Sequence, residues 1–445
     1  MNDISNTSPQ DHYAIIETVL EEARRAGADA AEAALSLETG LSVNVRLGEL
    51  ETLEYHRDKG LGVTVYLGES KGSASSSDLS RAAIAETVRA ACDIARYTGA
   101  DPCHGLAPRE RMAWDYPDLD LDHPWSIDAQ AAIELALACE SAARDFDRRI
   151  VNSEGASVSS HRGLHIYGNS HGFIGGYPST RHSLSCSVIG EQDQAMQRDY
   201  WYSTARDPAQ LLAPEEVGRI AAERTVARLG ARRLSTRQAP VLFSAEMAAG
   251  LIGHFLRAIR GGALYRQASF LLDSLGQSLF PPWMQMSEQP HLPTALGSAP
   301  FDNEGVATRE RKLVEDGVLR GYVLDSYSAR RLGMETTGNA GGVHNLVVEP
   351  GERDREALLR EMGSGLLVTE LMGQGVNGVT GDYSRGAAGF WVEQGEIQFP
   401  VEEITIAGNL REMYRQILAV GADVNPQRNI RTGSILVQNM TIAGE

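Results

Sequence analysis

The chain of 445 residues is 42% hydrophobic and 22% charged, a composition typical of a folded globular protein rather than a disordered or fibrous one. This length exceeds the usual size of one hydrophobic core and predicts two domains. The formal net charge of -18 argues against nucleic-acid binding, because a surface that follows phosphates needs clustered Lys and Arg.

The first residues, MNDISNTSPQDHY, are polar and lack the basic start and apolar stretch of a signal peptide. No stretch approaches the ~20 apolar residues of a transmembrane helix, so we expect a cytoplasmic protein that does not bind membranes. The four cysteines are widely spaced and never form a C-x-x-C pair, which favours free thiols in a reducing compartment.

The first half of the chain combines helical and strand patterns. Residues 1–10 are predicted to be a disordered tail, and residues 11–235 an N-terminal α/β domain. Apolar residues at helical spacing predict helices at 12–27, 81–98, 128–146 and 214–230. Alternating apolar residues predict strands at 41–67 and over about 151–205. We expect the domain boundary in the polar, charged stretch 231–240.

Residues 236–445 are predicted to form a mainly antiparallel β domain with a few helices, so the fold class is α+β. A strand leads into an apolar helix at 245–259. Two hairpins turn at the dipeptides Asp316-Gly317 and Gln394-Gly395, of which the first is typical of a type I′ turn. Residues 409–423 are predicted to be a helix with Asn409 as its N-cap, and 433–444 to be a closing strand.

Two glycine-rich motifs match known patterns without the required structural context. GNSHG at 168–172 fits G-x-S-x-G, but a nucleophile elbow needs a helix directly after the serine, and FIGGYPST cannot form one, so Ser170 is interpreted as a turn residue. GQGVNG at 373–378 fits G-x-G-x-x-G, but no helix follows to hold a pyrophosphate. We interpret it as a loop.

A run of histidines, His161, His165, His171 and His182, falls in the predicted strands. The first two are four residues apart, which would form a metal pair on a helix, but in a strand this spacing only places them on one face. We interpret the run as exposed strand histidines.

The predicted helix 245–259, AEMAAGLIGHFLRAI, contains one histidine, His254. A zinc peptidase helix presents two histidines and an adjacent glutamate that deprotonates the zinc-bound water. In the spacing H-E-x-x-H, the missing ligand and base fall on Gly250 and Leu251. With one more intervening residue, they fall on Ala249 and Gly250. None of these side chains can bind zinc, and the dipeptide His-Glu occurs nowhere in the chain.

Long blocks of the second half resemble the PmbA (TldE) branch of the TldD/PmbA metalloprotease family, which is also named for modulation of DNA gyrase. The blocks are GGALYRQASFLLDSLG, FDNEGVATR, YSARRLGMETTGNAGGVHN, TELMGQGVNGVTGDYSRGAAGFWVEQGEI and EITIAGN, and the resemblance covers essentially the whole chain. In the TldD branch the matching helix carries H-E-x-x-x-H, and a cysteine near the C-terminus adds a zinc ligand. By position, the helix motif falls on Ala249, Gly250 and His254, and the last cysteine here is Cys186.

The resemblance implies a non-catalytic subunit that pairs with a TldD-type zinc peptidase chain, as a heterodimer or larger assembly. The two chains would enclose a chamber for unfolded or small peptides, and zinc would be bound by the partner rather than tightly by this chain. Because the family's ligand and base positions fall on Ala249 and Gly250, the resemblance implies that this chain has no catalytic residues. His254 is the only position that keeps a possible zinc ligand. We expect peptide-binding residues on the predicted loop 380–389: Asp382, Tyr383 and Arg385.

Two other classes of function stay open. The chain could be a metallopeptidase in its own right, as a homodimer that assembles His254 and His344 with the carboxylates of FDNEG at 301–305. Alternatively, it could be a stand-alone peptide-binding or regulatory protein, which is suggested only by the gyrase-modulator name of the family.

Overall fold

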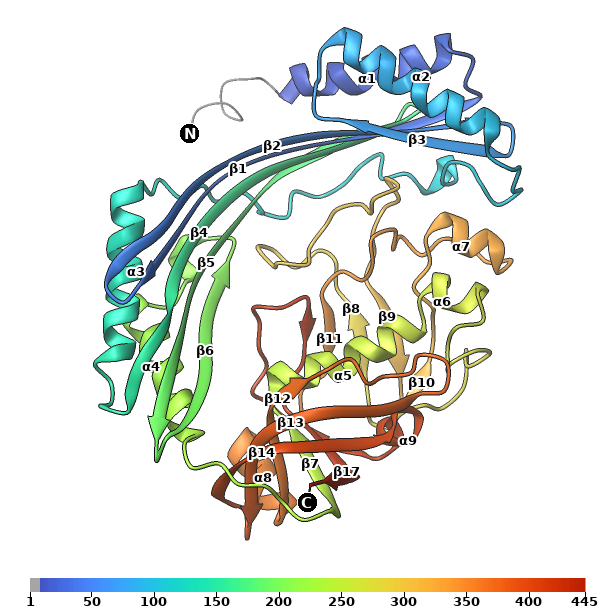
Figure 1. Cartoon of the computed structure of the whole chain (residues 1–445). Helices are drawn as coiled ribbons and strands as arrows, with labels where there is room; N and C mark the ends of the chain where they lie inside the picture. The colour runs from blue at the N-terminus through green and yellow to red at the C-terminus, as the bar shows by residue number, and fades with distance from the viewer. Residues whose placement is uncertain (1–8, 445) are drawn as a thin grey trace.

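The computed structural model of this protein describes residues 9–444 and confirms the predicted α+β class (Figure 1). Its helices are α1 (Pro9–Arg25), α2 (Arg81–Tyr97), α3 (Ala129–Arg144), α4 (Pro214–Ala227), α5 (Ala245–Ala258), α6 (Gly261–Tyr265), α7 (Ser326–Arg331), α8 (Arg355–Met362) and α9 (Leu410–Arg415). Within residues 9–444, no helix is both long and apolar enough to cross a membrane.

The N-terminal half is built on one antiparallel sheet of six strands in the order β3-β2-β1-β4-β5-β6. These strands are β1 (Ala30–Arg46), β2 (Glu49–Leu67), β3 (Ser70–Ser76), β4 (Ile150–Asn169), β5 (Ile174–Gln192) and β6 (Ala195–Ala205). Most are longer than the usual five or six residues of a strand. The sheet therefore arches over the C-terminal half (Figure 1), with β6 as one of its edge strands.

The two faces of this sheet differ in polarity. One face carries buried apolar residues such as Leu35 and Val158, which are covered by α1 and α2 toward one end and by α3 and α4 toward the other. On the other face, Ser42 lies opposite Ser159, which in turn lies opposite Ser183. The alternation follows from the period of two in a strand and leaves a polar face toward the C-terminal half.

The C-terminal half contains a closed barrel. Its strands are β7 (Arg237–Phe243), β12 (Gly365–Met372), β13 (Asp382–Glu393), β14 (Glu396–Asn409) and β17 (Ile435–Ala443), with β15 (Ile417–Val420) paired beside β17. The pairing of β14 with β17 closes the ring. Helix α5 contributes Ile252 and Phe255 to the hydrophobic core that it shares with the barrel strands.

A smaller sheet lies beside the barrel in the order β10-β9-β8-β11-β16. Its strands are β8 (Met286–Glu288), β9 (Arg311–Glu315), β10 (Val318–Leu319), β11 (Leu346–Val348) and β16 (Ile430–Arg431). The predicted turns are confirmed: Asp316 and Gly317 have φ of 51° and 73°, and Gln394 and Gly395 have φ of 55° and 80°. Positive φ at both central residues is what a type I′ turn requires.

Two predicted elements of the C-terminal half are wrong. The helix predicted at 409–423 ends at Arg415, and residues 417–420 form β15 instead, because they pair with β17. Residues 380–389, predicted to be a loop, lie mostly in β13, where they pair with both β12 and β14. In both cases tertiary strand pairing overrides the local sequence pattern.

The remaining predictions for the N-terminal half need smaller changes. Most of the predicted tail 1–10 lies outside the described residues, and α1 begins at Pro9. Ser170 lies in a turn, where its Oγ accepts a hydrogen bond from the backbone N of Ala31 at 3.0 Å. The prediction of exposed strand histidines is wrong. His161 and His165 lie in β4 but are partly buried, and His171 is partly buried in a turn. His182 is 1% exposed and lies between Ser160 Oγ (3.0 Å) and the carbonyl oxygen of His123 (2.9 Å).

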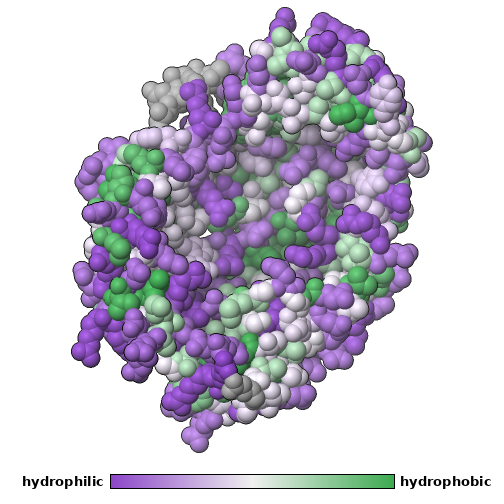
Figure 2. Space-filling view, in the orientation of Figure 1, coloured by the Kyte–Doolittle hydropathy of each residue, from purple (hydrophilic) through white to green (hydrophobic). Residues whose placement is uncertain are grey.

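The two halves are in direct contact at several places. The buried guanidinium of Arg206 donates hydrogen bonds to the carbonyl oxygens of Ala295 and Leu296, both at 3.0 Å. Phe173 of the N-terminal half packs edge-on against Phe301, with ring centroids 5.6 Å apart. Between such contacts, Figure 2 shows a hollow between the arched sheet and the C-terminal half.

Candidate functional site

Helix α5 carries the positions at which the family resemblance places a zinc site. Its buried stripe of Ala248, Ile252, Phe255 and Ile259 is fully inaccessible, as helical spacing predicts. Ala249 is 5% exposed, whereas Gly250 is exposed and has no atom within 4 Å of where a Cβ would stand. His254 is partly buried on the same face as Gly250, four residues further along the helix.

The ring of His254 lies against strand β13. Its centroid is 5.9 Å from that of Tyr383 at an interplanar angle of 75°. Burial, together with the nearby guanidinium groups of Arg385 and Arg257, lowers the pKa of His254 to about 4. The imidazole is therefore neutral at pH 7 and lies in a positively charged environment.

Tyr383 and Arg385 provide hydrogen-bond donors without acceptors beside this ring. Tyr383 is 2% exposed, and its buried hydroxyl forms no hydrogen bond of normal geometry, although Arg385 lies close enough to lower its pKa both by charge and as a hydrogen-bond donor. Arg385 donates from Nη2 to the carbonyl oxygen of Leu371 at 3.3 Å, but its buried Nε is also unpartnered. Burial raises the pKa of Tyr383 to about 12, although the charge of Arg385 opposes this shift, so the phenol keeps its proton and remains a donor.

Asp382 does not join these residues. Neighbouring side chains of a strand point to opposite faces, and Asp382 is exposed where Tyr383 is buried. Its carboxylate accepts hydrogen bonds from Thr380 Oγ1 at 2.6 Å and from Asn409 Nδ2 at 3.2 Å. Of the predicted peptide-binding residues, the structure brings Tyr383 and Arg385 to His254 and leaves Asp382 on the other side of the strand.

The residues of this site do not fit a zinc ion. Ala249 and Gly250 have no donor atoms, and zinc sites need three or four protein ligands. The guanidinium of Arg385 beside His254 also opposes a bound cation. Within residues 9–444, no group of three or more His, Cys, Asp or Glu side chains could hold a metal ion.

The residues considered for the homodimer hypothesis are engaged in other contacts. His344 lies beside the buried Glu288, which accepts a hydrogen bond from the backbone N of His344 at 2.7 Å. Asp302 accepts hydrogen bonds from three backbone N–H groups, those of Glu304, Val306 and Ala340, at 2.9 to 3.0 Å. Burial raises the pKa of Asp302 to about 6, against the effect of these hydrogen bonds. Within one chain, the carboxylate of Asp302 therefore stabilises the backbone of its own loop rather than binding a metal.

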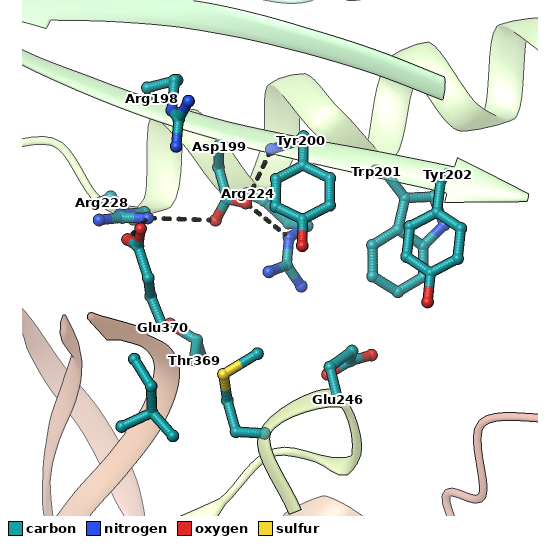
Figure 3. Close-up of a pocket in the computed structure, with 12 residues that line it drawn as sticks. Arg198, Asp199, Tyr200, Trp201, Tyr202, Arg224, Arg228, Glu246, Thr369 and Glu370 are labelled. Atoms are coloured by element: carbon teal, nitrogen blue, oxygen red, sulfur yellow. Dashed lines mark hydrogen bonds and ion pairs between the residues drawn. The ribbon is translucent and has the colours of Figure 1, made fainter. Parts of the chain in front are cut away.

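A cavity of about 160 Å³ lies beside the first turn of α5, between β6 and β12 (Figure 3). It is lined by Arg198, Asp199, Tyr200, Trp201, Tyr202, Arg224, Arg228, Glu246, Met247, Thr369, Glu370 and Leu371. Met247 lies on the same helix face as Gly250 and His254, and Leu371 both lines the cavity and accepts the hydrogen bond from Arg385. The cavity and His254 therefore lie along one face of α5.

The lining of this cavity includes both ion pairs and hydrogen-bond donors without partners. Arg228 pairs with Glu370 at 2.5 Å, and Arg224 with Asp199 at 3.3 Å. The buried Nε1 of Trp201 and the Oγ1 of Thr369 have no hydrogen-bond partner. These residues were not predicted to belong to a site, although the polar and aromatic run RDYWYS at 198–203 is a signal that could have indicated them.

Comparison with known proteins places the whole chain in one family. Three family models match it: PmbA/TldA metallopeptidase domain 1 at residues 31–95, the central domain at 122–229 and the C-terminal domain at 236–444. Metalloprotease PmbA of Escherichia coli O157:H7 is 55% identical over 94% of this chain and 93% of its own length. The PmbA homolog of Haemophilus influenzae is 53% identical over 96% of this chain and 95% of its own length.

Solved structures agree. A candidate modulator of DNA gyrase from Bacteroides thetaiotaomicron has a TM-score of 0.93 and 28% identity, over 98% of this chain and 99% of its own. TldE from Thermococcus kodakarensis has a TM-score of 0.86 at 22% identity, over 97% of this chain and 100% of its own, and therefore shows that the fold is shared.

The fold and these matches define a chain of the metallopeptidase type, along which the family models for domain 1, the central domain and the C-terminal domain match in that order. The chain belongs to the PmbA/TldA metallopeptidase family. Its likeness to the PmbA metalloproteases extends over nearly their full length, which confirms the predicted resemblance. A TldD homolog from Buchnera aphidicola is more distant, at 21% identity over 88% of this chain.

Proposed function

We propose that this chain is the non-catalytic, PmbA-type subunit of a two-chain zinc metalloprotease that acts on unfolded or small peptides in the cytoplasm. A TldD-type chain would supply the zinc ion, its ligands and the general base. The observation that carries the proposal is on α5: the ligand and base positions are Ala249 and Gly250, and cationic groups surround the one remaining histidine. The division into domains at 11–235 and 236–445 is part of the same proposal.

The role of this chain would be to shape the chamber and hold the peptide. Among the described strands, β6 pairs only with β5, and β7 pairs with β12 no further than Val368. The unpaired edges of Tyr200–Tyr202 and of Thr369–Leu371 therefore border the same cavity. Strand edges can bind an extended peptide through main-chain hydrogen bonds, which requires little sequence specificity.

The test is to measure zinc per chain in this protein purified alone, and peptide hydrolysis in the same sample before and after a TldD-type chain is added. We expect less than about one tenth of a zinc per chain, because three or four ligands are needed, and cleavage only after mixing. About one zinc per chain with chelator-sensitive cleavage by the chain alone would support the homodimeric peptidase instead. Failure to form a complex or to gain activity would favour a stand-alone binding protein.

The variant His254→Ala separates a vestigial position from a working one. In the mixed complex, we expect this variant to retain the activity of the unaltered chain within about twofold. A large loss of activity with normal folding and unchanged peptide binding would contradict the proposed non-catalytic role.

A further inference from the structure

We propose that the α5 face around His254 is a binding site for a peptide carboxylate, held by Tyr383 and Arg385. The inference rests on the proposed peptide-binding role and names the group that is recognised. Two sources share this chemistry, the C-terminal carboxylate of a peptide and the side chain of an internal Asp or Glu.

Two buried donors beside His254 lack acceptors in normal hydrogen-bond geometry. The hydroxyl of Tyr383, on a side chain that is 2% exposed, and the Nε of Arg385 form no hydrogen bond of normal geometry, although the two side chains are close enough for Arg385 to lower the pKa of the phenol. Buried polar groups are normally satisfied, and an unsatisfied donor destabilises the fold. A carboxylate has two oxygens and no hydrogen to donate, so it could accept from both groups.

The positive charge around His254 also favours a carboxylate. The whole chain carries a formal net charge of -18, yet Arg385 and Arg257 are both close enough to His254 to lower its pKa. Among residues 9–444, neither arginine has a carboxylate partner, although the nearby Arg228 is paired with Glu370 at 2.5 Å. The carboxylate of Asp382, the acidic neighbour on β13, is held on the opposite face. The site thus has positive charge without an internal counter-ion.

Open space lies along this face of α5, where a peptide could approach the site. Gly250 and Gly253 leave this face of α5 without side chains, and a Cβ at Gly253 would meet only Ile430 Cδ1, at 3.8 Å. A peptide end could therefore lie against the helix, with the preceding residues directed along Met247 into the cavity of Figure 3. The Tyr383 hydroxyl and the Arg385 Nε are buried behind the half-buried ring of His254, so binding requires this ring to move aside. The neutral imidazole of His254 forms one wall of the site and places no further charge in it.

The experiment measures peptide binding to the purified full chain alone by calorimetry. Three acetylated tetrapeptide probes are compared: tetraalanine with a free carboxyl end, the same peptide amidated, and an amidated peptide with one internal glutamate. Loss of a charge-assisted pair weakens binding about tenfold to hundredfold, and this is the difference that we expect between the free acid and the neutral amide. The internal glutamate distinguishes the two sources: equally tight binding of that probe would assign the site to acidic side chains, and weak binding to C-terminal carboxylates.

Three variants test the named residues. Tyr383→Phe removes a buried hydroxyl that forms no hydrogen bond of normal geometry, so its temperature of thermal unfolding should not fall, while binding of the free acid weakens about fivefold. Arg385→Gln should weaken binding at least tenfold, and Arg385→Lys should restore part of the loss because the charge is kept. Asp382→Asn, on the opposite face of the strand, is the matched control and should bind as the unaltered chain does.

Equal binding of the acid and the neutral amide, or undiminished binding by both Tyr383→Phe and Arg385→Gln, would overturn the inference. Neither result depends on a TldD-type chain or on hydrolysis. The inference can therefore fail while partner-dependent cleavage is observed, and the reverse also holds.

Discussion

Introducing the family's zinc-motif residues at Ala249 and Gly250 of α5 tests whether these two residues alone, or also the surroundings of His254, prevent zinc binding. The substitution Gly250→Glu places a side chain where no atom lies within 4 Å of the Cβ position. Replacing a mid-helix glycine by a helix former stabilises by about 0.5 to 1 kcal/mol. Repulsion by Glu246, four residues earlier, costs about 0.2 to 0.5 kcal/mol. We therefore expect Gly250→Glu to be slightly stabilising, and Gly250→Ala, which lacks the charge, to stabilise by about 0.5 to 1 kcal/mol.

Adding Ala249→His should reverse this gain. Ala249 is 5% exposed, and forcing an imidazole into a packed position costs about 1 to 3 kcal/mol. The double variant would present two histidines and a glutamate, but no third protein ligand for zinc, and Arg385 would still oppose the ion. We expect the double variant to fold and to bind much less than one zinc per chain.

The assays are urea denaturation for each variant and zinc analysis after dialysis, with the unaltered chain as control. If Gly250→Glu destabilised the fold by more than about 1 kcal/mol, the open space at this position would be refuted. If the double variant bound one zinc per chain and cleaved peptides alone, the surroundings would have kept a ligand set, and the argument from the cationic environment would be wrong.

Two further predictions concern buried charges. The pKa of about 4 for His254 lies below that of an unfolded histidine, near ~6.5. The unfolded chain therefore binds the proton first as pH falls, and stability declines from about pH 6.5 toward pH 4. His254→Asn should lose about 1 kcal/mol less between pH 7 and pH 5 in urea denaturation, after discounting for partial exposure; an equal loss would contradict the burial of the ring. Glu288, 2% exposed, accepts from Arg311 Nε at 2.8 Å, so Glu288→Gln should cost about 3 to 5 kcal/mol in the same assay. The exposed pair of Glu315 with Lys312 is the control, and Glu315→Gln should cost less than about 1 kcal/mol; similar costs for the two variants would argue against the buried network.

Sequence patterns located the elements whose stability depends on local spacing. The helices near 12–27, 81–98, 128–146 and 214–230 are present within a few residues, because one buried stripe at helical period is enough to define each. The hairpin turns at 316–317 and 394–395 are also present, since positive φ at two successive residues restricts the choice of amino acid. Patterns that fold through distant partners were predicted less well, as β13 and β15 show.

The candidate site divides in the same way. The absence of a zinc motif at Ala249 and Gly250 could be established from the sequence, because a ligand requires a donor atom. The neighbours of His254 could not, since Tyr383 and Arg385 lie more than 120 positions later in the chain and reach α5 only through the pairing of β13 in the barrel. The same pairing fixes which side chains of β13 face α5. It places Tyr383 and Arg385 on that face and Asp382 on the opposite one.

The sequence by itself therefore determined the fold class, the family and the absence of metal-binding side chains at Ala249 and Gly250, because periodicity, turn chemistry and donor atoms are properties of the residues themselves. The tertiary structure decided what surrounds His254. Closure of the barrel brings a buried phenol and an arginine to the remaining histidine, and the arch of the N-terminal sheet places β6 beside the first turn of the same helix. Such contacts depend on strand register and on the packing of distant segments, which no local pattern specifies.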